Sequence, residues 1–143
     1  MKIFLIKREN RIEPIYKMSM DYVDSMQKNV VYSAEMRKPR NPKFHNMVFA
    51  LAKCALDNMP ENRQAWKHYT PYEFIKMLQI EIGVTEKMIR LNGEVVQIPK
   101  SIAFESMDEN EFEKTIAEPM FEVCAKILGC TVDELKTNYV NYL

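Results

Sequence analysis

The sequence is poor in glycine, cysteine and histidine, and it has no long hydrophobic run. Among 143 residues there are three glycines, three cysteines and two histidines. Each glycine stands alone at a predicted turn or helix end, so none is left for a phosphate-binding loop or a dinucleotide-binding turn. No apolar stretch approaches the roughly 20 residues of a membrane span, and the apolar run at residues 3–6 is too short for a signal peptide. We therefore expect a soluble, cytoplasmic protein without membrane contact.

The few cysteines and histidines also argue against metal sites and catalysis. Cys54, Cys124 and Cys130 form no Cys-x-x-Cys pair and have no histidine at ligand spacing, which indicates buried, reduced thiols. Neither a Gly-x-Ser-x-Gly nor a His-Glu-x-x-His spacing occurs. Glu134 and Lys136 come nearest to a nuclease pattern, but they fall in a predicted helix just after a capping box. We expect no enzyme, no metal and no cofactor.

Charge is balanced overall but unevenly distributed along the chain. The sequence has 20 Lys+Arg and 20 Asp+Glu, yet residues 1–53 carry a net +6 and residues 105–143 a net −6. Such asymmetry indicates a basic contact surface or pairing between opposite patches. A second reading is that the two ends fold against each other and cancel. The sequence leaves both readings open.

Short strands and helices alternate in an order that predicts a single α+β domain over residues 1–143, with small N-terminal strands, a central amphipathic helix, an Asn-Gly hairpin and C-terminal helices. The predicted strands cover residues 2–7, 11–16, 30–36 and 101–104. Asn92-Gly93 is the strongest short hairpin signal and predicts a further hairpin from residues 84–90 and 94–98.

Capping residues and apolar periodicity predict the helices. A brief helix is expected over residues 20–27 with Ser19 as its cap, and the clearest helix over residues 41–58, with Asn41 as N-cap before Pro42. The segment 58–69 is expected to be a loop with at most one helical turn. Further helices are predicted over residues 70–83, over 108–128 with a kink or a split at Pro119, and from Thr131 onward.

The entry to the 41–58 helix gathers positive charge. Four cations fall within seven residues: Arg37, Lys38, Arg40 and Lys43. Clustered cations beside a helix N-terminus suit phosphate groups and predict salt-sensitive binding without sequence preference. Stacking of single-stranded bases could use Phe44 and Phe49 or the Trp66/Tyr69 pair. The alternative is a solvated loop, with Phe44 and Phe49 facing the core.

This same region carries a family resemblance. The run Pro-Arg-Asn-x-x-Phe-His-x-x-x-Phe-Ala-Leu, from Pro39 to Leu51, follows an N-terminus that begins Lys-Ile-Phe-Leu-Ile-Lys. Together these motifs resemble a family of phage and prophage proteins of unknown function, and the segments 99–104 and 128–135 resemble it too. The resemblance therefore touches most of the chain, although only the Arg-Asn-x-x-Phe-His segment is specific.

The segment is also similar, more distantly, to the NinB/Orf family of phage recombination mediators, whose run is Arg-Ser-x-x-Gln-Asn-x-x-x-Trp-Ala. Arg40, Asn41, His45 and Phe49-Ala50 match it, whereas a phenylalanine replaces its glutamine. Those proteins are homodimers that bind single-stranded DNA and help to load a recombinase past the host single-strand-binding protein. The resemblance implies a phage-encoded, non-catalytic accessory protein of DNA recombination or replication in a bacterial host, and a homodimer. The acidic final third departs from this expectation.

Two functions are therefore carried forward. The first is binding of single-stranded DNA or RNA, with host single-strand-binding protein as a further partner; its candidate residues are Arg37, Lys38, Arg40, Lys43, His45 and Lys53. The second is an anti-defence inhibitor, of the anti-CRISPR type, that occupies the basic surface of a host nuclease such as a CRISPR effector. Its candidate residues are Glu105, Asp108, Glu109, Glu111 and Glu113.

Overall fold

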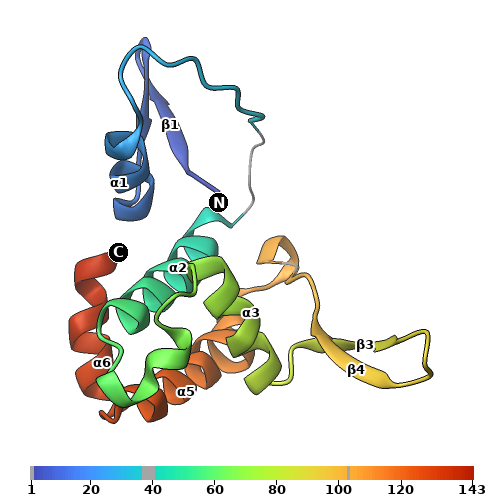
Figure 1. Cartoon of the computed structure of the whole chain (residues 1–143). Helices are drawn as coiled ribbons and strands as arrows, with labels where there is room; N and C mark the ends of the chain where they lie inside the picture. Colours follow the sequence, from blue (N-terminus) through green and yellow to red (C-terminus); the bar gives the residue numbers. More distant parts are fainter. Residues whose placement is uncertain (1, 37–40, 103) are drawn as a thin grey trace.

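The computed structural model describes residues 2–36, 41–102 and 104–143. Its first element is an antiparallel hairpin of β1 (Leu5–Arg8) and β2 (Arg11–Pro14), joined by a two-residue turn in which Glu9 has a φ of 51°. The predicted N-terminal hairpin is thus confirmed, with its first strand shifted toward the turn. The hairpin and α1 lie at the end of the molecule near the start of the central helix (Figure 1).

The first helix differs from its prediction because of a tertiary contact. Helix α1 spans Lys17–Ser25 and begins before Ser19, so Ser19 is not its cap. The Ser19 side chain is instead 2% exposed, and its hydroxyl oxygen accepts a hydrogen bond from the Phe4 N–H at 2.9 Å. This bond joins the helix to the chain just before β1, a pairing that a local capping rule does not predict.

Two predicted strands are wrong. Within the described residues, the segment 30–36 forms no strand, and Val31 is 97% exposed. Ser101 and Ile102 are also non-strand, and a short 3-10 helix, η2 (Phe104–Ser106), follows. β-branched and aromatic content favours a strand only where a neighbouring strand takes up its N–H and C=O groups. The described sheets have two strands each and offer these segments no partner.

The predicted central helix is confirmed as α2 (Pro42–Asp57). It lies among the other long helices (Figure 1), and its buried face includes Phe44, Val48 and Leu51. A 3-10 helix, η1 (Glu61–Trp66), follows in the segment predicted to hold one helical turn. Helix α3 (Pro71–Glu81) then begins with a capping box, in which Thr70 and Glu73 exchange hydrogen bonds of 2.9 and 3.2 Å.

The Asn-Gly hairpin is confirmed. Strands β3 (Thr85–Ile89) and β4 (Val95–Pro99) pair antiparallel. In the turn, Gly93 has a φ of 83°, and the Asn92 side-chain oxygen accepts a hydrogen bond from the Glu94 N–H at 2.9 Å. A positive φ is strained for most residues but not for glycine, which explains why this pair fixes the turn. Figure 1 shows the hairpin pointing away from the helices.

The C-terminal helices follow their predicted order. Helix α4 (Glu109–Phe112), the π-helical turn η3 (Glu113–Ala117) and α5 (Glu118–Leu128) run on from one another. Pro119 lacks the N–H that an α-helix would offer to a carbonyl four residues earlier. The predicted interruption takes the form of this π turn, in which the Glu118 N–H bonds to the Glu113 carbonyl. Helix α6 (Val132–Tyr139) and the short η4 (Val140–Tyr142) complete the chain.

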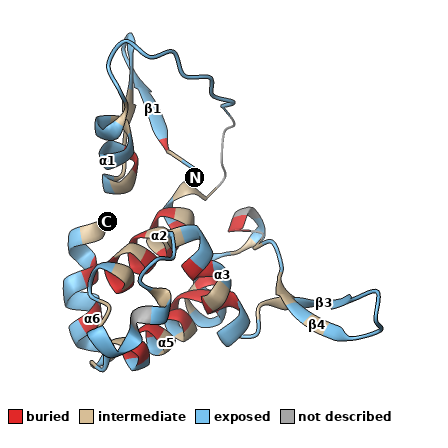
Figure 2. Ribbon diagram, in the orientation of Figure 1, coloured by how far each residue is buried: buried red, intermediate tan, exposed pale blue. Residues whose placement is uncertain are grey.

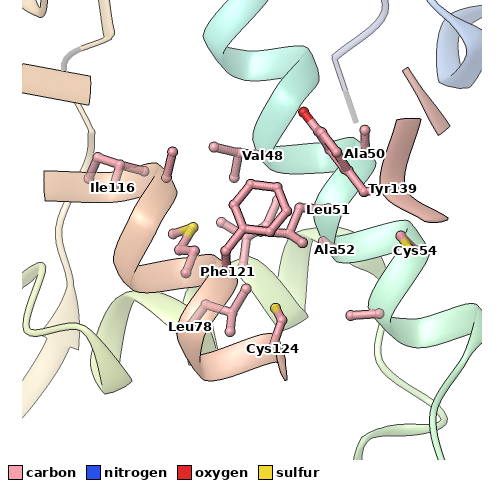
Figure 3. Packing of buried hydrophobic residues seen from close by; sticks show 14 of the residues in the cluster. Val48, Ala50, Leu51, Ala52, Cys54, Leu78, Ile116, Phe121, Cys124 and Tyr139 are labelled. Carbon is pink, nitrogen blue, oxygen red and sulfur yellow. The ribbon is translucent and has the colours of Figure 1, made fainter. Parts of the chain in front are cut away.

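The core lies between α2, α3, α5 and α6, whose facing sides are buried in Figure 2. Its largest fully buried side chains include Phe74, Leu78, Phe112 and Met120. Figure 3 shows Phe121 and Leu78 beside residues of α2. With two small antiparallel hairpins added to these helices, the chain has the predicted α+β fold. No helix of the described chain is long and apolar enough to cross a membrane.

Candidate nucleic-acid interface

The basic cluster is only partly visible. Arg37, Lys38 and Arg40 lie outside the described residues. Lys43 is described: it is exposed in the first turn of α2, where its ammonium group forms an ion pair of 2.8 Å with Glu109 of α4. The hydrogen bond and the negative charge of Glu109 raise the pKa of Lys43, and the same bond lowers the pKa of Glu109.

The Lys43–Glu109 pair joins the two candidate surfaces. Lys43 belongs to the predicted nucleic-acid set and Glu109 to the predicted inhibitor set, although they are 66 residues apart in sequence. Beneath them, Phe44 and Phe112 stack with ring centroids 4.1 Å apart and planes 5° from parallel. The start of α2 and the start of α4 are thus held together, so part of the basic third does fold against part of the acidic third.

A shallow depression of about 350 Å³ lies at this junction. The residues that line it combine charged side chains with the stacked aromatic pair: Lys43, Phe44, Met47, Glu109, Asn110, Phe112 and Glu113. Its charged members are one lysine and two glutamates. A site of that composition does not attract phosphate, so the depression itself is a poor nucleic-acid pocket.

His45 and Asn41 have structural partners. The His45 ring is half-buried and lies 4.3 Å from the Phe104 ring and 6.0 Å from the Phe4 ring, centroid to centroid. Asn41 occupies the N-cap position, but its side chain makes no capping bond to any described residue and donates to the Phe104 carbonyl instead. These residues therefore fasten α2 to the N-terminal segment and to η2, a role that local sequence did not predict.

Lys53, the last residue of the predicted nucleic-acid set, forms an ion pair of 2.9 Å with Asp57 one turn further along α2. Ten residues separate it from Lys43, which is about 15 Å along a helix with a rise of 1.5 Å per residue. Successive residues are about 100° apart around the axis, so the two lysines also point in different directions. The structure does not bring Lys53 and Lys43 together.

The acidic candidates lie around the start of α4. Asp108 accepts a hydrogen bond of 2.8 Å from the Glu111 N–H, Glu111 is exposed, and Glu113 is half-buried. The side chain of Glu105 lies outside the described part of the structure. Since Asp108 caps the helix and Glu109 pairs with Lys43, both already have intramolecular roles.

A second set of basic and aromatic residues, which we call the Tyr72 patch, lies along the segment from η1 into α3. All of its members are exposed except Trp66, which is half-buried and packs against the core: Arg63, Trp66, Lys67, Tyr69, Tyr72 and Lys76. The Lys76 ammonium nitrogen lies 4.4 Å from the Tyr72 ring centroid, and the Arg63 guanidinium carbon lies 5.8 Å from that of Trp66. Tyr72 is 55% exposed and Tyr69 40%. Exposed rings with adjacent cations are the side chains that single-stranded nucleic acids use for stacking and phosphate contact.

Sequence reasoning singled out Trp66 and Tyr69 as a stacking pair but missed the other four members. The sequence signal for these four residues is the alternation of cations and aromatics over residues 63–76, in which the cations are less densely spaced than in residues 37–43. Glu73, the acidic residue within this stretch, uses its carboxylate to cap α3. Since the same stretch holds three cations, Arg63, Lys67 and Lys76, the patch has a net positive charge.

The three cysteines form no disulfide, and the expectation that they are buried holds for two of them. Cys54 and Cys124 are buried, and Cys130 is half-buried. Burial raises the pKa of the Cys54 thiol to about 11. Across the described ranges, no group of three or more His, Cys, Asp or Glu side chains is arranged to hold a metal ion.

No protein-family model matches this sequence, and no curated protein or solved structure is significantly similar to it.

Proposed function

We propose that this protein is a phage-encoded, non-catalytic accessory protein of DNA recombination or replication that binds single-stranded nucleic acid. The observation that carries the proposal is the Tyr72 patch, where the exposed Tyr72 ring lies beside Lys76 and the half-buried Trp66 ring lies beside Arg63. Arg37, Lys38 and Arg40 are the additional phosphate contacts that the sequence indicates. Host single-strand-binding protein is the further partner, and a homodimer the assembly, that the resemblance implies.

Phosphate contacts and base stacking are both expected, and their different dependence on salt concentration distinguishes them. Each lysine or arginine that contacts a phosphate contributes about 0.7 to the slope of log affinity against log salt on a single strand. Base stacking on an aromatic ring contributes about 1–3 kcal/mol per base and depends little on salt. Loss of Tyr72 should therefore weaken binding about fivefold or more at every salt concentration, whereas loss of cations should flatten the salt dependence.

The test is fluorescence anisotropy of a labelled oligothymidylate over a series of NaCl concentrations. Tyr72→Ala should weaken binding, and the matched variant Tyr72→Phe, which keeps the ring, should bind as the wild type does. Arg63→Ala with Lys76→Ala, which removes two cations of the Tyr72 patch, should reduce the salt slope. The proposal fails if the wild type does not bind at low salt, or if Tyr72→Ala and the double cation variant both leave binding unchanged.

An anti-defence inhibitor is the second candidate function, and the exposed Glu111 at the start of α4 is the feature that favours it. It predicts a stable complex with a host nuclease and loss of nuclease activity in a purified assay. Glu111→Lys should weaken that inhibition, and Glu122→Lys, at an exposed position of α5, is the matched control. The geometry favours this function less, because Asp108 and Glu109 are engaged within the chain.

A further inference from the structure

The β3–β4 hairpin exposes more apolar surface than a solvated hairpin needs. Leu91 is fully exposed, Ile89 is 73% exposed, Val95 55% and Met88 44%. A two-stranded hairpin alone in water is marginally stable, and an edge strand with apolar side chains is a template for further pairing. Since the hairpin points away from the helices (Figure 1), its distal half has no packing partner in the described chain.

The hydrogen-bond register shows which backbone groups of β3 are unused. The Arg90 N–H donates to the Glu94 carbonyl at 2.8 Å, and the Lys100 N–H donates to the Val84 carbonyl at 3.3 Å. In an antiparallel ladder hydrogen-bonded pairs alternate, so the even-numbered residues of β3 face β4. The N–H and C=O groups of Thr85, Lys87 and Ile89 point outward, where the described chain places no further strand.

We propose that the outer edge of β3 pairs antiparallel with β3 of a second copy of this chain, which creates a four-stranded sheet in the order β4-β3-β3-β4. When two identical strands pair antiparallel, the two-fold axis perpendicular to the sheet passes midway between the two copies of one residue, which lie directly opposite each other. With Met88 at the axis, Lys87 of each copy exchanges hydrogen bonds with Ile89 of the other. This arrangement uses the outward-pointing groups of both residues.

Charge complementarity selects this register. With Met88 at the axis, Glu86 of each copy lies directly opposite Arg90 of the other, and opposite charges across a strand pair are stabilising. An axis through Glu86, Lys87 or Arg90 would place like charges opposite each other, and an axis through Thr85 or Ile89 would place no opposite charge across from Glu86 or Arg90. Glu86 makes no ion pair with any described residue of its own chain, so its carboxylate is available. Arg90 also remains near Glu94, with which it pairs at 3.0 Å.

The same register gathers the exposed apolar residues. On the face that carries Met88, the two methionines meet at the axis with Val96, the cross-strand neighbour of Met88, on either side. On the other face, Ile89 lies next to its cross-strand neighbour Val95 and opposite the aliphatic stem of the second copy's Lys87. The interface does not depend on nucleic acid, and the protein could dimerise in this way whether or not the proposed function is correct.

Proline substitution tests which edge is used. Ile89→Pro removes an outward N–H of β3 and no bond to β4, and Val95→Pro makes the matching change on the outer edge of β4. Light scattering coupled to gel filtration, with nuclease-treated full-length protein, should give twice the 16.9 kDa chain mass for the wild type and Val95→Pro, and the chain mass for Ile89→Pro. A wild type that stays monomeric up to on the order of 100 µM, or an Ile89→Pro variant that stays dimeric, overturns the proposal.

Cysteine cross-linking tests the register without proline. In a non-hydrogen-bonded antiparallel pair the Cα atoms are about 4.5 Å apart, so Met88→Cys should form an intermolecular disulfide under mild oxidation. The matched Ile89→Cys should not, because its symmetry mate lies about 8 Å away, from two residues of rise and one strand spacing. The wild type, with its native cysteines, gives the background. Cross-linking through Ile89→Cys alone, or through neither variant, overturns the register.

Discussion

Removal of the buried hydroxyl of Tyr139 is predicted to stabilise the protein, whereas most substitutions in a core destabilise it. Tyr139 is 6% exposed, and its oxygen is buried without a hydrogen-bond partner among the described residues. Its ring packs edge-on against Phe121 with centroids 5.0 Å apart and an interplanar angle of 89°. Figure 3 shows both rings beside α2. Tyr139→Phe keeps this packing and removes the hydroxyl.

A buried polar group without a partner costs about 1–3 kcal/mol in lost hydration. We therefore expect Tyr139→Phe to raise the free energy of unfolding by about 1 kcal/mol or more. With a urea dependence of roughly 1–3 kcal/mol per molar, the unfolding midpoint should rise by about 0.5 M. Circular dichroism during urea titration measures it, and Tyr72→Phe, whose side chain is largely exposed, should change the midpoint little.

The pH dependence gives a second measurement on the same pair of proteins. Burial raises the pKa of Tyr139, and the nearby negative charge of Glu113 raises it further. In the unfolded chain a tyrosine loses its proton near pH 10, whereas the folded protein retains it. Because the folded state then binds more protons, the stability of the wild type should fall as the pH rises above about 10.

Tyr139→Phe has no such proton, so its advantage over the wild type should grow between roughly pH 9 and 11. If the variant is instead less stable than the wild type by more than about 0.5 kcal/mol at neutral pH, the hydroxyl has a partner and the reasoning is wrong. A variant stability that stays parallel to the wild type at high pH would contradict the raised pKa.

Three further predictions concern single side chains. Phe112→Ala should lower the free energy of unfolding by about 3–5 kcal/mol, because Phe112 is 1% exposed and stacks on Phe44; a loss below 1 kcal/mol in urea titration would contradict this packing. Thr131→Ala should cost about 0.5–2 kcal/mol as the α6 capping box is lost. Hydrogen bonds from the Thr131 backbone and side chain hold the pKa of Glu134 below its ordinary value. Thr131→Ala should therefore raise the pKa of Glu134 part of the way toward that value, as measured by NMR titration. An unchanged pKa would mean that the Thr131 hydroxyl has no share in the shift. The lowered pKa implies stability that is present above about pH 4 and lost as acid protonates the folded carboxylate. Finally, iodoacetamide should alkylate half-buried Cys130 before buried Cys54 and Cys124, and peptide mass spectrometry that finds Cys124 modified first would refute the burial order.

Much of the secondary structure followed from local sequence signals. Asn92-Gly93 defined the second hairpin, and Thr70 and Thr131 marked two helix starts through capping boxes that form as predicted. These signals succeed because the groups that satisfy each other are within four residues, so the chain need not be folded to bring them together.

Predictions that depended on a distant partner were the ones that failed. The segment 30–36 has strand-like composition but no neighbouring strand in the described structure, and Ser19 bonds to Phe4 rather than capping its helix. For the candidate site, sequence found part of the aromatic surface in Trp66 and Tyr69. It missed the cations that lie over the rings, although this signal is local: Arg63 precedes Trp66 by three residues and Lys76 follows Tyr72 by four, spacings that place side chains next to each other on a helix.

By itself, the sequence determined the fold class, the long helices, both hairpins and the uneven distribution of charge. Only the tertiary structure decided that Lys43 meets Glu109, that His45 is packed between Phe4 and Phe104, and that β3 has an unused edge. The physical reason is range: capping and periodicity act within a few residues, whereas ion pairs, ring contacts and strand edges depend on which distant segments burial of the core brings together.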